Sequence, residues 1–173
     1  MQNTRFLADA MLGRLARWLR AIDADTLQLP LDTADREIVA RAAAEGRVLL
    51  TRDRHLLREL RPDRALAVRS DVPLQQLVEV VHAFDLRRPA EFLTRCLLCN
   101  TQLDVLPASE ARAVVPPRSR DLPGIVRRCP SCGRVYWRGS HVRRMEAALL
   151  AALSEWPELA PCNVTSDEMS RQS

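Results

Sequence analysis

The residues Arg5-Phe6-Leu7-Ala8-Asp9 form a short apolar run that ends at a carboxylate. The segment that follows, residues 11–22, carries apolar side chains at positions 11, 12, 15, 18, 19 and 22, which is the spacing of one helical face. A short buried strand that passes directly into an amphipathic helix is the first half of a βαβ unit. This beginning therefore predicts an α/β fold.

The same alternation continues to about residue 85. Apolar runs predict buried strands at 47–51 and 65–69, and helical spacing predicts helices at 34–44, 54–60 and 73–84. Gly46 stands where the first of these helices should stop, and Pro73 where the last should start. Strands separated by helices pair in parallel, so we expect an α/β parallel sheet with helices on both faces.

Two closely spaced cysteine pairs follow this region, with 29 residues between them. They are Cys96-Leu97-Leu98-Cys99 and Cys129-Pro130-Ser131-Cys132. Two residues between cysteines allow one tight turn to direct both sulfurs at one ion, so the four thiols predict a structural zinc site. Asn100 and Gly133 come directly after the pairs, and both residue types tolerate the left-handed backbone at the exit of such a knuckle. Disulfides or unligated thiols are the alternatives.

The chain has 173 residues, 47% of them hydrophobic, which is enough for one packed domain and a small appendage. We expect an α/β domain at 1–90, a zinc ribbon with its following helix at 94–146, and a flexible acidic tail at 157–173. No apolar stretch approaches the roughly 18 residues of a membrane span, so we expect a soluble, cytoplasmic protein with no membrane partner. In that reducing compartment cysteine pairs bind metal more often than they form disulfides, and Cys162 is then a bystander thiol.

Arginine supplies all 26 strongly basic residues, and no lysine is present. Residues 94–144 hold ten arginines and three acids, whereas residues 1–93 and 145–173 carry net charges of +1 and −4. Codon bias in a GC-rich genome explains the absence of lysine but not the clustering. A concentration of arginine on the cysteine-bearing segment is typical of a module that contacts a phosphate backbone.

Three aspartates, Asp9, Asp53 and Asp71, each lie at or just beyond the carboxyl end of a predicted strand. In an open parallel sheet these ends share one edge, where ligands bind. Carboxylates gathered there repel one another unless cations neutralise them, so we expect a divalent metal site that Asp35 joins from the side. Asp25 is a candidate accessory acid. Taken singly, Asp35, Asp53 and Asp71 are each also explained as helix caps or partners of a helix dipole.

Five ordered motifs resemble the Mut-seven carboxy-terminal ribonuclease family, which is PIN-like, over about residues 5–146. The motifs are residues 6–20, 25–26, 47–53, 95–100 and 136–141. The resemblance implies a PIN-like α/β nuclease domain with a carboxy-terminal zinc ribbon, and metal-dependent cleavage of RNA by clustered acids. In that pattern Asp9 resembles the acid after the first strand and Asp53 the acid after a later strand. Asp35 matches the acid of the intervening helix, and Asp71 resembles a fourth acid by position.

These observations lead to the hypothesis that the protein is a ribonuclease. In this hypothesis RNA lies across the carboxyl edge of the sheet, where Asp9, Asp35 and Asp53 hold catalytic Mg²⁺ or Mn²⁺. Basic and aromatic residues on the first helix and on the ribbon are the candidates for binding the nucleic acid. They are Arg14, Arg17, Arg128, Arg134, Trp137, Arg138 and His141. Arg14 and Arg17 are equally well explained as solvated helix charges, and Tyr136 and Trp137 as the small core of the ribbon.

Other functions fit parts of the pattern. A non-catalytic RNA-binding or ribosome-associated protein would keep the fold and the ribbon without the chemistry. A toxin-like PIN nuclease would be held by a separate antitoxin. A rubredoxin-like electron carrier is the third alternative, since four thiolates also bind iron. The sequence identifies no protein partner.

Overall fold

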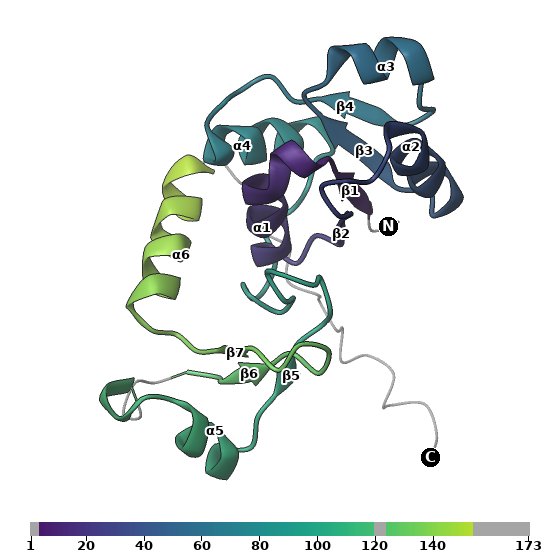
Figure 1. The fold of residues 1–173 in the computed structure, drawn as a ribbon. Coiled ribbons are helices and arrows are strands. Elements are labelled where there is room, and N and C mark those ends of the chain that lie inside the picture. Colours follow the sequence, from purple (N-terminus) through teal and green to yellow (C-terminus); the bar gives the residue numbers. More distant parts are fainter. Residues whose placement is uncertain (1–3, 120–123, 154–173) are drawn as a thin grey trace, which may run out of the picture.

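The structure is a computed structural model that describes residues 4–119 and 124–153. Its larger part is a sheet of four parallel strands in the order β2-β1-β3-β4 (Figure 1). The strands are β1 (Phe6–Ala8), β2 (Thr26–Gln28), β3 (Val48–Thr51) and β4 (Ala65–Ala67). The register pairs Ala8 with Leu50 and Thr51 with Ala67, so the carboxyl ends of the three neighbouring strands lie at one edge.

Helices cover both faces of the sheet, as the sequence predicts. The helices are α1 (Gly13–Ala21), which follows a 3₁₀ turn η1 (Ala10–Leu12), α2 (Asp35–Ala44), α3 (Arg54–Leu60) and α4 (Pro73–Ala83). Phe6 and Leu50 pack with the α1 and α4 side, whereas Leu7 and Leu49 pack with the α2 and α3 side. Successive strand residues point to opposite faces, so a sheet that is covered on both sides requires continuous apolar strands.

The second part is a small antiparallel sheet that carries the cysteines. Its strands are β5 (Asp104–Val105), β6 (Arg127–Arg128) and β7 (Val135–Tyr136), in that order in the sheet. Asn100 has φ 68° and Gly133 has φ 72°, so both residues after the cysteine pairs adopt the expected left-handed conformation. The predicted fold class, a parallel α/β sheet followed by a four-cysteine ribbon, is confirmed.

The chain returns from the ribbon to the first domain through helix α6 (Ser140–Ala152). Leu149 and Leu153 are buried in the same core as Phe6 and Leu50. Figure 1 shows α6 beside α4 and α1, with the ribbon at its other end. The segment after the ribbon therefore completes the core of the domain before it.

Several elements differ from the sequence prediction. Strand β2 and helix α5 (Ala108–Val114) were not expected, and α1 begins as a 3₁₀ turn. Strand β2 has three residues and lies at the edge of the sheet, with β1 as its neighbour. Thr26 is its one fully buried residue, so β2 does not need the apolar run by which a buried strand is recognised in a sequence. The predicted tail at 157–173 and Cys162 lie outside the described residues. In the part of the chain that is described, no helix is both long enough and apolar enough to cross a membrane.

Candidate active site, cysteine cluster and arginine-lined cavity

The order of the strands marks the position of a ligand site. The chain leaves β1 for β2 on one side and later places β3 on the other side of β1, so the strand order reverses between β1 and β3. In open α/β sheets ligands bind at the carboxyl ends of the strands at such a switch point. Asp9 comes directly after β1, and Asp53 comes two residues after β3. The two aspartates thus flank the switch point.

A single buried hydroxyl joins these two aspartates. Thr51, the last residue of β3, is fully buried, and its Oγ1 donates to Asp9 Oδ2 at 2.7 Å. The same oxygen accepts from the backbone N–H of Asp53 at 3.0 Å. Thr51 was not among the residues predicted for the site, although a hydroxyl at the carboxyl end of an otherwise apolar strand is a signal that the sequence contains.

The Asp9 carboxylate is nearly buried but has no cationic partner. The exposed fraction of the whole Asp9 residue is 9%. The backbone N–H of Asp9 donates to Leu50 O at 2.9 Å. Within residues 4–119 and 124–153, no arginine or histidine forms an ion pair with Asp9. A buried carboxylate with one hydrogen-bond donor and no counter-ion retains coordination capacity for a metal ion.

Asp53 also caps the helix that follows it. Its Oδ1 accepts from Leu56 N at 3.0 Å and from His55 N at 2.7 Å, so the capping interpretation holds for that oxygen. These hydrogen bonds, the one from Leu56 first, hold the pKa of Asp53 below its ordinary value. The cap therefore favours the charged form of the Asp53 carboxylate and orients its Oδ1 toward the start of α3.

The other two predicted acids lie differently. Asp35 is the first residue of α2 and is exposed. Asp71 is 81% exposed and forms an ion pair with Arg52. Among the described residues, no three carboxylates have oxygen atoms that all lie within 4.8 Å of one another. The structure thus joins Asp9 to Asp53 through Thr51 and does not gather all four acids into one cluster.

Asp25, the candidate accessory acid, lies at the opposite edge. It precedes β2, which runs parallel to β1, so it stands at the amino ends of the strands. Its Oδ1 accepts from Arg47 Nη1 and from Asn100 Nδ2, each at 2.7 Å. Burial favours a higher pKa for Asp25, but the hydrogen bonds from Arg47 and Asn100 outweigh it and lower the pKa. Asp25 therefore links the α/β domain to the first cysteine knuckle.

The four predicted metal-ligating cysteines form one compact cluster. Their sulfurs all lie within 4.8 Å of one another, with Cys96 Sγ 3.7 Å from Cys132 Sγ and Cys99 Sγ 3.4 Å from Cys129 Sγ. A disulfide requires about 2.05 Å, so these four thiols are free. Four thiolates at about 2.3 Å from a tetrahedral Zn²⁺ stand about 3.8 Å apart. The cluster fits a structural zinc ion.

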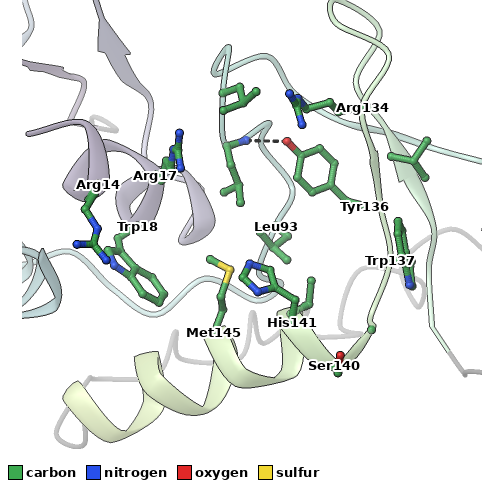
Figure 2. A pocket seen from close by; sticks show the side chains of 15 residues that line it. Arg14, Arg17, Trp18, Leu93, Arg134, Tyr136, Trp137, Ser140, His141 and Met145 are labelled. Atoms are coloured by element: carbon green, nitrogen blue, oxygen red, sulfur yellow. Dashed lines mark hydrogen bonds between the residues drawn. The ribbon is translucent and has the colours of Figure 1, made fainter. Parts of the chain in front are cut away.

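Tyr136 belongs to the core of this ribbon. Its hydroxyl accepts from Leu97 N at 3.1 Å (Figure 2). The same hydroxyl lies 3.2 Å from Cys96 Sγ. Burial, and after it the contact with Cys96, raises the pKa of Tyr136. These contacts favour the core interpretation for Tyr136 over base stacking.

Arg20 anchors the first knuckle to the α/β domain. Its side chain is 3% exposed, and it donates to Leu97 O at 2.9 Å, Leu98 O at 2.7 Å and Thr26 O at 2.9 Å. Arg20 follows Arg14 and Arg17 at three-residue steps along α1, but helical spacing alone does not show that a distant loop covers the last turn of this helix.

We expect the substitution Arg20→Met to lower the free energy of unfolding by about 2–4 kcal/mol, because three carbonyls lose a buried charged donor. Urea denaturation of the zinc-loaded protein measures the change. The matched control is Arg17→Met, one turn earlier and exposed, which should change stability by no more than about 0.5 kcal/mol. Equal stability of the two variants would contradict the anchoring role.

Five of the seven predicted nucleic-acid contacts line one cavity of about 680 Å³. The cavity lies between α1, the first knuckle, β7 and α6 (Figure 2). The five residues are Arg14, Arg17, Arg134, Trp137 and His141. Arg128 and Arg138 do not line it, and each faces a carboxylate, that of Glu110 at 3.5 Å and that of Glu146 at 3.1 Å respectively.

Comparison with known proteins identifies one family. A family model described as Mut7-C RNAse domain matches residues 4–149. That match includes both sheets, Asp9, Asp53 and all four clustered cysteines. No curated protein and no solved structure matches the chain.

Proposed function

Because the chain belongs to the Mut7-C RNase domain family, we propose that it is a metal-dependent ribonuclease that hydrolyses RNA phosphodiester bonds at the carboxyl edge of its parallel sheet. The observation that carries the proposal is the hydroxyl of Thr51 at the β1/β3 switch point, which donates to the Asp9 carboxylate and accepts from the backbone N–H of Asp53. Both the position in the sheet and the donor types suit phosphodiester hydrolysis.

The donor set fits Mg²⁺ or Mn²⁺. Both ions prefer carboxylate oxygen and water, and Asp9 is a nearly buried carboxylate that no described cation neutralises. We assign Asp9 and Asp53 as the ligands. Asp35, exposed at the start of α2, would have to move toward them to act as a third. When bound, the ion lowers the pKa of a coordinated water and stabilises the negative charge of the leaving oxygen.

The residues of the chain hold this arrangement in place. Thr51 donates to Asp9 Oδ2 and leaves Oδ1 available for a ligand, while the first backbone N–H groups of α3 orient Asp53 through its Oδ1. Asp71 is neutralised by Arg52, so in this proposal its role is to hold the Arg52 guanidinium at the same edge. Carboxylates that hydrogen bonds already orient reduce the reorganisation that the reaction requires.

The direct test is cleavage of labelled RNA by the purified protein with Mg²⁺, with Mn²⁺ and without a divalent ion. We expect cleavage only with an added ion, and its restoration by Mg²⁺ alone after chelation, because chelators also remove zinc. Binding of RNA without cleavage under every condition would support the non-catalytic alternative and contradict the proposal.

A further inference from the structure

Four basic side chains from three separate elements border the cavity beside α1. Arg14 and Arg17 come from α1, Arg134 from the turn before β7, and His141 from the first turn of α6 (Figure 2). All four are exposed, and no aspartate or glutamate lines the same space. Such a one-signed hollow between low-dielectric walls concentrates anions.

The fold does not use the charges of these arginines. Within residues 4–119 and 124–153, the guanidinium groups of Arg14, Arg17 and Arg134 form no hydrogen bond or ion pair. By contrast, Arg20 and Arg47 are buried and bonded within the fold. Unpaired arginines on one concave surface suit bidentate contacts with phosphate groups.

Apolar side chains line the space between these charges. Trp18 and Met145 face the cavity from α1 and α6, and Leu93 also lines it (Figure 2). The volume of about 680 Å³ lies within the range of small-ligand sites, so an unstacked nucleobase can enter. A base buries its faces against apolar and aromatic side chains while arginines hold its phosphate.

The cavity is connected to the candidate active site by α1. This helix begins four residues after Asp9, at the carboxyl edge, and ends at Ala21, whose carbonyl accepts from Leu93 N below the cavity. Its nine residues span about 14 Å, at about 1.5 Å per residue. Arg14 is the second residue of α1 and Arg17 lies one turn further from Asp9, so a strand held by both arginines would run along α1 toward Asp9.

We propose that this cavity binds a segment of single-stranded RNA, with an unstacked base against Trp18 and Met145 and its phosphates on Arg14, Arg17 and Arg134. The identification of the ligand as RNA rests on the proposed function. A single strand is required because a paired base cannot reach the apolar floor without leaving its duplex.

The test measures binding of a fluorescein-labelled oligouridylate of about ten nucleotides by anisotropy, with the full chain carrying Asp9→Asn so that cleavage does not interfere. The variant Arg14→Ala/Arg17→Ala should bind about 15-fold more weakly at 0.15 M salt, and its log–log salt slope should fall by about 1.4, for two lost phosphate contacts. His141→Ala should also weaken RNA binding, but it should change the salt slope less than the double arginine variant does.

The matched controls are Arg36→Ala, exposed on α2 at the other face of the sheet, and His55→Ala, exposed on α3. Both should bind like the parent, and thermal melts should show that every variant is folded. An unchanged affinity of the double variant, an equal loss with Arg36→Ala, or equally tight binding of the same RNA as a duplex would overturn the proposal. The cleavage assay tests the proposed function separately. Loss of the cavity's role in RNA binding would leave Asp9-dependent cleavage possible, and absence of cleavage would leave RNA binding in the cavity possible.

Discussion

Asp9→Asn is expected to lower the rate of RNA cleavage at least about a hundredfold, because loss of a metal-ligating carboxylate removes several kcal/mol of transition-state stabilisation. The substitution keeps the side-chain volume, and the Asn oxygen still accepts from the Thr51 hydroxyl, so the fold should remain intact. Initial rates with saturating Mn²⁺, together with a thermal melt, measure both effects. RNA affinity should stay within about twofold of the parent, because the arginines that carry most of the affinity are unchanged.

The control for this prediction is Asp63→Asn. Asp63 is exposed and precedes β4, at the amino ends of the strands, so its loss should leave the cleavage rate unchanged. If Asp9→Asn cleaves as fast as Asp63→Asn, the carboxyl edge is not the active site.

Thr51 offers a second test of the same site through a residue that positions a ligand. Thr51→Val keeps the shape of the buried side chain but removes the donor to Asp9, so kcat should fall about tenfold. The Mn²⁺ concentration for half-maximal activity should rise while KM for RNA stays constant. Thr51→Ser, which restores the hydroxyl, should recover most of the activity; a structural role alone would not give that rescue.

Removal of the zinc ion is expected to unfold the cysteine ribbon. Structural Zn²⁺ contributes about 10–16 kcal/mol of apparent binding free energy in small zinc-binding peptides, which exceeds the stability that three two-residue strands can supply. Cys96→Ser should therefore lose the bound zinc, measured by elemental analysis, and the amide protection of residues 94–105 and 127–136, measured by hydrogen exchange. A loss of zinc with unchanged protection would contradict the prediction.

The positions of the cysteines also predict that serine substitutions in the two pairs will affect α1 to different extents. Cys96 is fully buried beside Tyr136, in the knuckle that Arg20 ties to α1, whereas Cys132 is exposed. Cys96→Ser should therefore reduce protection at the end of α1 more than Cys132→Ser does. Cys162→Ser, which belongs to neither cysteine pair in the sequence, is the control and should retain zinc. A red protein after aerobic purification would indicate iron and favour the rubredoxin-like alternative.

Sequence patterning was sufficient for most of the fold. The apolar runs before Asp9 and Asp53 and the helical spacing between them predicted a parallel sheet covered on both faces, because each strand must bury both of its sides. Strand β2 escaped prediction because its partner strand β1, and not its own composition, makes it a strand. A helix was expected after the ribbon, and α6 confirms it. The packing of Leu149 and Leu153 into the core of the α/β domain is a long-range contact that no local pattern encodes.

For the candidate site, too, the sequence identified some residues, whereas the contacts between them depend on the tertiary structure. Residue type and strand position alone selected Asp9, Asp53 and the four cysteines, since carboxylates at strand ends and thiols at two-residue spacing are local features. The tertiary structure decided which acids meet: it joined Asp9 and Asp53 through Thr51, paired Asp71 with Arg52 and placed Asp25 at the opposite edge. It also separated Arg20, buried under the first knuckle, from Arg14 and Arg17, which face the cavity. A sequence sets the chemistry and the period of each segment, whereas the partner of a side chain depends on which distant segment packs against it.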